Sequence, residues 1–94
     1  MEVRYFANIR DLTKETKTQF NGRAATLAAL LRDLSARYGR PFEQRVFPNG
    51  QLDDTIIVLV NGRDIRHLNG IDTPLKETDV VAIFPVVAGG QNRY

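Results

Sequence analysis

The sequence contains no cysteine and only one histidine among its 94 residues. Without cysteine the chain can form no disulfide, no thiolate metal site and no cysteine nucleophile. Its one histidine, His67, has no second histidine or cysteine to share a metal with, and we expect it at the surface. The sequence therefore predicts that the protein binds no metal and no cofactor of its own.

Long apolar runs and a strong charge bias are also missing. No apolar run approaches the roughly 18 residues of a membrane helix, and Glu2 and Arg4 interrupt the start of the chain, so we expect no secretory signal. The 13 basic and 11 acidic residues give a net charge of +2, and the basic residues form no cluster in the sequence. We expect neither nucleic acid nor membrane as a partner, and a cytoplasmic location.

Groups that could catalyse a reaction are scarce as well. Ser35 is the only serine and falls in a predicted helix, so a serine–histidine–acid set is excluded. No glycine-rich phosphate loop opens a helix. Asp11, Asp53 and Asp54 are isolated carboxylates, which solvated turns explain better than acid–base catalysis does. We predict that the protein has no catalytic residue and is not an independent enzyme.

The chain does contain one clear amphipathic helix, over residues 25–38. Its apolar residues recur at helical spacing and would form one stripe across a sheet: Leu27, Leu30, Leu31, Leu34 and Tyr38. Thr26 is a good N-cap, and Gly39 follows the last turn, where glycine is favoured.

Five strands are predicted around this helix, over residues 1–7, 14–20, 55–60, 63–66 and 80–84. Asn61-Gly62 is a strong hairpin signal between the third and the fourth. Residues 8–12 and 69–79 are predicted as connections, the latter with Leu75 turned inward. Residues 40–54 are a helical turn or an irregular segment, anchored by Phe42, Val46 and Phe47.

The order of these elements predicts a small α+β fold, with a mixed sheet of four to five strands packed on one main helix. The first and last strands are apolar enough to be central, and as neighbours they must run parallel. We expect one domain over residues 1–86 and a flexible tail over residues 87–94, because the Gly89-Gly90 pair has no side chain to bury.

Both ends of the chain resemble those of a known family. The ending is Phe84-Pro85-Val86-Val87-Ala88-Gly89-Gly90, and the beginning is Val3-Arg4-Tyr5-Phe6-Ala7-Asn8-Ile9-Arg10-Asp11-Leu12. These segments, with Asn61-Gly62 and residues 73–83, are similar to the MoaD/ThiS family of ubiquitin-like sulfur carriers, closest to the small subunit of molybdopterin synthase. The resemblance implies a β-grasp (ubiquitin-like) fold. One departure is that residues 91–94 follow Gly90, whereas carriers of this branch end at the second glycine.

The resemblance also implies a function. An E1-like adenylyltransferase (MoaB/MoeB/ThiF-like) would adenylate Gly90 with ATP, and the product would become a thiocarboxylate. A larger synthase subunit (MoaE-like), or another acceptor enzyme, would take the sulfur for molybdenum or tungsten cofactor biosynthesis. Val87, Ala88 and Gly89 would thread into the partner, and Phe84, Pro85 and Val86 would dock against it. A peptidase would first have to remove residues 91–94.

Other functions remain open on the sequence alone. The exposed glycine could be joined to lysines of other proteins, as in a ubiquitin-like modifier. The carrier could serve another sulfur pathway: thiamine, sulfur amino acids or tRNA thiolation. A domain that is never processed could act as a non-covalent binding module. A chain that ends at Gly90 in cells favours the first two possibilities, and a retained Tyr94 favours the third.

Overall fold

The computed structural model describes residues 1–21 and 24–86. Its helices and strands follow one another along the chain as β1 (Glu2–Tyr5), α1 (Ile9–Thr13), β2 (Lys17–Gln19), α2 (Leu27–Tyr38), α3 (Arg40–Val46), β3 (Ile56–Val60), β4 (Arg63–Asp64) and β5 (Val80–Pro85). Short 3₁₀ turns lie at η1 (Pro48–Gly50), η2 (Ile65–His67) and η3 (Gly70–Asp72). In the described part of the chain no helix combines the length and the apolar character that crossing a membrane requires.

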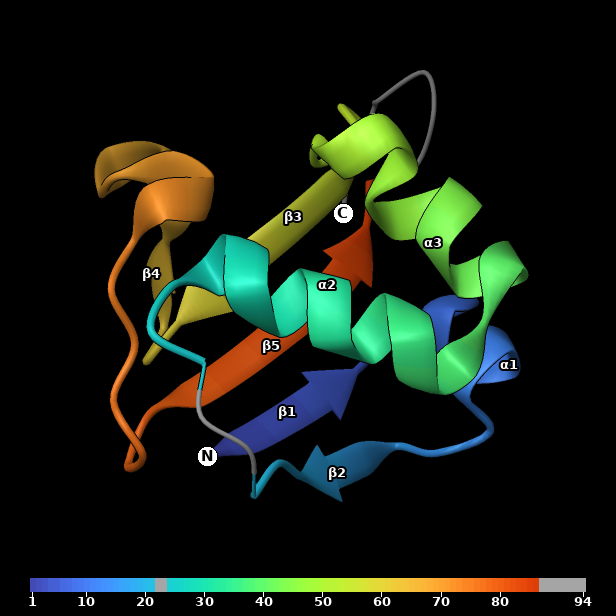
Figure 1. The fold of residues 1–94 in the computed structure, drawn as a ribbon, viewed down its shortest axis with the longest axis horizontal. Coiled ribbons are helices and arrows are strands. Elements are labelled where there is room, and N and C mark those ends of the chain that lie inside the picture. Colours follow the sequence, from blue (N-terminus) through green and yellow to red (C-terminus); the bar gives the residue numbers. More distant parts are fainter. Residues whose placement is uncertain (22–23, 87–94) are drawn as a thin grey trace.

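The strands form one five-stranded mixed sheet in the order β2-β1-β5-β3-β4. The central pair, β1 and β5, is parallel, with Val3 opposite Val81 and Tyr5 opposite Ile83. The other pairs are antiparallel. The predicted α+β fold is confirmed, including the first and last strands side by side at the centre, with α2 crossing the sheet in front of them (Figure 1).

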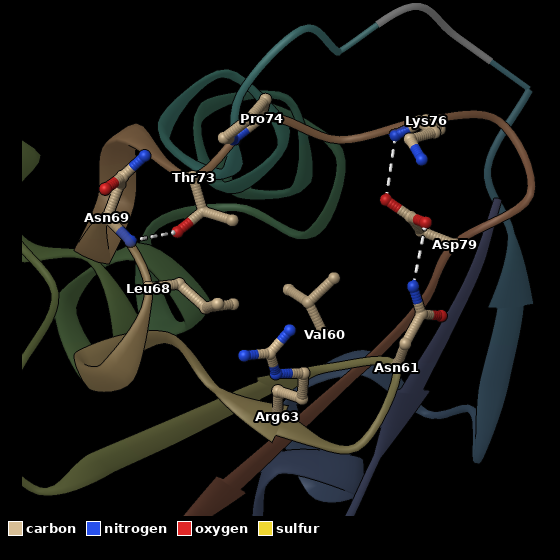
Figure 2. A pocket seen from close by; sticks show the side chains of 9 residues that line it. All are labelled: Val60, Asn61, Arg63, Leu68, Asn69, Thr73, Pro74, Lys76 and Asp79. Atoms are coloured by element: carbon tan, nitrogen blue, oxygen red, sulfur yellow. Dashed lines mark hydrogen bonds between the residues drawn. The ribbon is translucent and has the colours of Figure 1, made fainter.

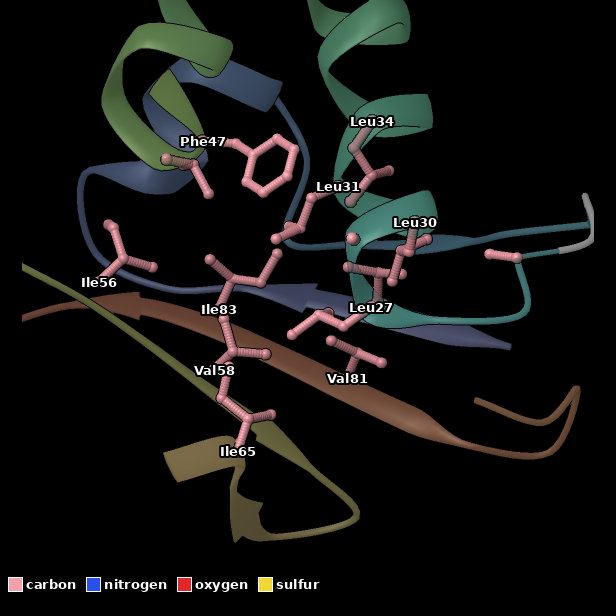
Figure 3. Packing of buried hydrophobic residues seen from close by; sticks show 14 of the residues in the cluster. Leu27, Leu30, Leu31, Leu34, Phe47, Ile56, Val58, Ile65, Val81 and Ile83 are labelled. Carbon is pink, nitrogen blue, oxygen red and sulfur yellow. The ribbon is translucent and has the colours of Figure 1, made fainter. Parts of the chain in front are cut away.

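One face of the sheet and the leucine stripe of α2 form the core (Figure 3). Leu27, Leu30, Leu31 and Leu34 are completely buried, as are Val58, Val81 and Ile83 beneath them. Phe42 and Val46 of α3 are also completely buried, and Phe47 nearly so, which confirms them as the anchors of this segment. Leu75 is partly buried against the same cluster, as predicted.

The ends of α2 are set by the residues that the sequence indicates. The Thr26 side chain accepts a hydrogen bond from the Ala29 N–H at 3.2 Å, which satisfies one otherwise unpaired donor of the first turn. Gly39 follows with φ of +94°, and its N–H donates to the Ser35 carbonyl at 2.9 Å. Glycine adopts this φ without the penalty that a Cβ would impose, so the chain can turn directly into α3.

Residues 8–12, predicted as a connection, are instead largely helical: α1 runs from Ile9 to Thr13 and buries both of these residues. The helix ends at Lys14 in the left-handed conformation, where its N–H donates to the Arg10 carbonyl at 2.7 Å. β1 and β2 are shorter than predicted, because the turn before α1 takes the end of the first predicted strand and the segment after α1 takes the start of the second.

The Asn61-Gly62 hairpin is confirmed. Both residues have positive φ, +52° and +84°, as a tight turn between twisted antiparallel strands requires. β4 is only two residues long, because the chain enters η2 at Ile65, where the Asp64 side chain accepts from the Arg66 N–H. His67 ends η2 and is exposed, as expected.

Candidate functional site

The site that the sequence singles out begins where β5 ends. Phe84, Pro85 and Val86 are the last described residues, whereas Val87, Ala88, Gly89 and Gly90 lie outside the described residues. The geometry that bears on function is therefore that of the tail root, by which we mean residues 84–86 together with Phe6 and Thr55, which contact them.

Pro85 releases the chain from one neighbouring strand but not from the other. The Phe6 N–H donates to the Ile83 carbonyl at 3.1 Å, and in a parallel pair the next bond would run from the N–H of residue 85. Proline has no N–H to give. On the opposite side β3 stays paired, with Pro85 opposite Ile56 and the Val86 N–H donating to the Thr55 carbonyl at 2.7 Å. Up to Val86, the last described residue, the chain therefore stays hydrogen-bonded on the side of β3 and not on the side of β1.

β5 extends one residue past its predicted end at Phe84, because Pro85 remains paired with β3. Proline discourages pairing because it removes a donor. Here the missing donor faces β1, whose own strand ends at Tyr5, so the antiparallel pairing with β3 loses nothing.

An apolar strip covers the face of the sheet that points away from the helices. Its members alternate with the buried residues along β3 and β5 and are all partly exposed: Ile57, Leu59, Ala82 and Phe84. Ile57 lies opposite Phe84, and Leu59 opposite Ala82. Phe6 extends the strip, with its ring 5.2 Å from that of Phe84 and 41% of its surface exposed. We call these five residues the outer strip.

Charged groups flank the strip on β1. Arg4 pairs with Glu2, and the hydrogen bond from the arginine side chain lowers the pKa of the Glu2 carboxyl. Arg4 lies directly opposite Ala82 in the parallel register. A partner that covers the outer strip would therefore meet an apolar surface with an ion pair at its edge.

A second group of side chains holds Thr55, the residue that anchors Val86. The Asp53 carboxylate accepts hydrogen bonds from the Thr55 N–H at 3.0 Å and from the Thr55 hydroxyl. The Arg45 side chain donates to the hydroxyl oxygen of Thr55 at 2.8 Å. The hydrogen bond from the Thr55 side chain, with that from its N–H, lowers the pKa of the Asp53 carboxyl. These contacts fix the backbone whose carbonyl receives the tail.

The structure thus brings the three predicted docking residues together with two residues that the sequence analysis did not select. Phe6 could have been found from the sequence. It falls on the same face of the first strand as the charged residues Glu2 and Arg4, where a large aromatic side chain is unexpected. Thr55 carries no such signal, since it contributes its main-chain carbonyl.

Nothing else in the described residues competes as a reactive centre. No group of three or more histidine, aspartate or glutamate side chains in residues 1–21 and 24–86 could hold a metal ion. The tail root offers apolar contact and main-chain hydrogen bonds, and its side-chain hydroxyl, that of Thr55, is already bonded to Asp53 and Arg45. Such an arrangement suits presentation of a chain end to another protein.

Comparison with known proteins identifies relatives over nearly the whole chain. The model of the ThiS family matches residues 3–90. Small archaeal modifier protein 3 of Haloferax volcanii is 35% identical over 91 residues, which are 96% of this chain and 98% of that protein. The sulfur carrier protein CysO of Mycobacterium tuberculosis is 37% identical over 67 residues, 69% of this chain and 72% of CysO.

Solved structures agree with these matches. The small archaeal modifier protein 1 of Methanosarcina acetivorans superposes with a TM-score of 0.80 at 32% identity, covering 95% of this chain and 94% of that one. CysO in the BexX/CysO complex of Amycolatopsis orientalis gives a TM-score of 0.79 at 28% identity, over 95% and 98% of the two chains.

Proposed function

The chain belongs to the ThiS family of ubiquitin-like sulfur carriers, and from this membership we propose that it carries sulfur as a thiocarboxylate on Gly90. The observation that carries the proposal is the family match through Gly90, four residues after Val86, whose N–H is still bonded to the Thr55 carbonyl. Its relatives are carriers and modifiers, not enzymes, and the protein acts as a substrate of its partners.

The chemistry needs activation by a partner. A carboxylate is a poor electrophile, because its charge is delocalised and its leaving group would be oxide. An E1-like adenylyltransferase transfers AMP from ATP to the Gly90 carboxylate and releases pyrophosphate. Hydrosulfide from a sulfur donor then attacks the acyl carbon and AMP leaves, and the resulting thioacid loses its proton to give the thiocarboxylate. Because the chain has no cysteine, the acyl carbon is where it can hold this sulfur.

The tail root and the outer strip form the docking surface in this proposal. Phe84, Pro85 and Val86 fix where the tail leaves, and Val87, Ala88 and Gly89 enter the partner in an extended form. Gly89 and Gly90 have no side chain, so a narrow channel can admit them. Phe6 and Phe84 supply exposed aromatic surface, the kind of residue that often dominates binding at protein interfaces.

Gly90 must first become terminal. As encoded, its carbonyl is joined to Gln91 in an amide, which has no carboxylate to adenylate. We propose that a peptidase hydrolyses the Gly90–Gln91 bond and releases residues 91–94. Because adenylation consumes ATP, the cytoplasm is the expected setting.

The acceptor of the sulfur is the least constrained part of the proposal. The termini resemble the molybdopterin synthase branch, which favours a MoaE-like synthase subunit and a pterin product. The relatives found by comparison are archaeal modifiers and CysO carriers. Molybdenum or tungsten cofactor synthesis therefore stays a prediction, beside delivery to thiamine, sulfur amino acids or tRNA.

One observation favours a second function. Small archaeal modifier protein 3, which is 35% identical and matched over 98% of its length, is named a modifier. The same adenylate could be attacked by a lysine amine instead of sulfur, which would join Gly90 to another protein through an isopeptide bond. Peptides bearing a Gly-Gly remnant on lysine, recovered from the native cells, would support this role.

The deciding experiment is the intact mass of the protein isolated from its native cells. A species that ends at Gly90, with one oxygen replaced by sulfur, is the expected result. A chain that always retains Tyr94, and that stays unchanged with ATP and the cognate activating enzyme, would refute carrier and modifier alike and leave the non-covalent binding module.

A further inference from the structure

A cavity of about 360 Å³ opens near the start of β5 (Figure 2). The tail root lies at the other end of this strand. It lies between the β3–β4 turn, the segment after η2 and the loop that leads into β5. The lining residues are Val60, Asn61, Arg63, Leu68, Asn69, Thr73, Pro74, Lys76 and Asp79. The carrier chemistry at Gly90 uses none of them.

The wall beside β5 is held by hydrogen bonds on both sides of Asp79. Asn61 donates its amide to one carboxylate oxygen at 2.9 Å, and the Lys76 N–H donates to the other at 2.8 Å (Figure 2). The side-chain amide oxygen of Asn61 (Oδ1) in turn accepts from the Val80 N–H at 2.9 Å. The single carboxylate of the lining is therefore already engaged by the protein.

The opposite wall is fixed in a similar way. The Thr73 hydroxyl donates to the Gly70 carbonyl at 2.7 Å and accepts from the Asn69 N–H at 3.1 Å. The Thr73 carbonyl also accepts from the Leu27 N–H at 3.0 Å, which attaches this wall to the start of α2. Both walls are thus in place before any ligand arrives.

Two positive charges in the lining are not used in this way. Within residues 1–21 and 24–86, neither Arg63 nor Lys76 has a carboxylate within ion-pair distance, and neither side chain donates a hydrogen bond to the protein. They lie on different sides of the cavity, with Val60 between them (Figure 2). Val60, Leu68 and Pro74 provide apolar surface within the same cavity.

We propose that this cavity binds an acidic peptide segment of a partner protein, with one apolar side chain on Val60 and Leu68 and flanking carboxylates on Arg63 and Lys76. Charge complementarity argues for this occupant, because the two charged side chains of the lining that have no partner in the described residues, Arg63 and Lys76, are both cations. The volume is near the lower end of small-molecule sites, which span about 300–1,000 Å³, so it suits a side chain better than a nucleotide. A simple anion would leave the apolar surface uncovered.

The position of the cavity relative to the tail root bears on how a carrier would bind its partner. The cavity and the tail root lie at opposite ends of β5, so a partner can hold the cavity while the tail end occupies an active site. A contact of this kind raises the effective concentration of the tail at that active site. Binding at the cavity does not itself require Gly90, so its test is independent of the sulfur chemistry.

The test is an NMR titration of the full chain with a short capped peptide that has one leucine between two glutamates in an alanine–serine background. We expect shifts of the amides of Arg63, Leu68 and Lys76, and an affinity that falls as salt rises. Peptides with glutamine for glutamate, or alanine for leucine, should each bind more weakly, and inorganic phosphate should not reproduce the shifts.

The double variant Arg63→Glu with Lys76→Glu should bind the peptide roughly tenfold more weakly or worse, because two charge-assisted contacts become repulsive. The matched control is Arg32→Glu with Arg40→Glu, which changes the net charge equally at exposed helical positions and should bind normally. Equal binding by both double variants, or by the glutamine peptide, would overturn the proposal. Shifts that phosphate alone reproduces would indicate a general anion site and overturn it as well.

Discussion

The N–H of Val86 donates to the carbonyl of Thr55 across 2.7 Å, immediately after a proline that has no donor for the other neighbouring strand. Val86 is thereby held on the side of β3, whereas Pro85 offers no hydrogen bond to the side of β1. This asymmetry gives the end of the chain a defined starting point and direction, which a partner that accepts a narrow tail would require.

The first prediction concerns Gly90. In a chain that ends at residue 90, Gly90→Ala should leave the melting temperature unchanged, because a glycine at the end of a chain has no side chain for the core to lose. Adenylation and thiocarboxylate formation should be lost, since a methyl group at the acyl residue obstructs a channel shaped for glycine. Intact mass after incubation with the activating enzyme, ATP and a sulfur donor measures the outcome, with the unsubstituted chain as control. Full activity of the variant would remove Gly90 from the site.

The second prediction concerns the outer strip. Phe6→Ser should raise the KM of the activating enzyme for this protein by roughly tenfold, about 1.4 kcal/mol. The exposed Phe6 ring next to Phe84 supplies contact area that the serine lacks. The matched control is Phe20→Ser, which removes an aromatic ring packed against the core instead. Phe20→Ser should lower the melting temperature more than Phe6→Ser does, and it should change the KM less. The reverse ranking would place the docking surface elsewhere.

The third prediction is a pH dependence of stability through Glu15. Its carboxylate accepts from Thr18 at 2.7 Å and from Tyr38 at 3.1 Å, and chiefly the hydrogen bond from Thr18 lowers its pKa in the folded state. A pKa lowered by folding means that the ionised form stabilises the native state above the unfolded-state pKa. This contribution is lost as the pH falls through the folded-state pKa.

Glu15→Gln tests this directly. Denaturant unfolding of the variant and the parent, measured from neutral pH down to the acid range, should give a stability difference at neutral pH that narrows as the pH falls. The exposed Glu77→Gln, for which no hydrogen bond to Thr18 or Tyr38 exists, serves as the control. A difference that is constant with pH would show that ionised Glu15 does not stabilise the fold.

The fourth prediction separates the scaffold from the tail. Leu30→Ala should cost about 2–5 kcal/mol of unfolding free energy, because the Leu30 side chain is completely buried between α2 and the sheet. Leu75→Ala, at a partly buried position, should cost less. At a temperature where both variants stay folded, each should form the thiocarboxylate at the parent rate. A selective loss of activity in Leu30→Ala, with its fold intact, would show that the core does more than support the tail.

The sequence predicted the fold because its strongest signals are periodic. The leucines of α2 recur at helical spacing and reveal its buried face, and Thr26, Gly39 and Asn61-Gly62 mark ends and turns by backbone chemistry. The uninterrupted apolar run of β3 indicates a strand but suggests burial on both faces, whereas Ile57 and Leu59 are partly exposed. The helix α1 was missed because five residues are too few to show a helical period, and no side chain caps its start.

The candidate site was predictable only in part. Phe84, Pro85 and Val86 follow from their order in the chain, but the one-sided effect of Pro85 depends on which strand ends at Tyr5. Arg63 and Lys76 belong to different connecting segments and lie on different sides of a cavity that three such segments form. No local pattern contains that information, since tertiary packing alone brings these segments together.

The last prediction concerns the four residues after Gly90. Gln91→Pro in the full chain should block removal of residues 91–94, because most peptidases cleave poorly before proline, whose ring and missing N–H disturb substrate binding. The protein should then keep its full mass in extract of the native cells and form no thiocarboxylate. A chain ending at Gly90 needs no cleavage and should be active in the same extract, which separates a failure of trimming from a failure of activation. Gln91→Ala is the matched control and should be trimmed normally. If the Gln91→Pro chain retained Tyr94 and still gained sulfur, the sulfur would have to reside elsewhere than on Gly90, and the carrier mechanism proposed for this tail would be wrong.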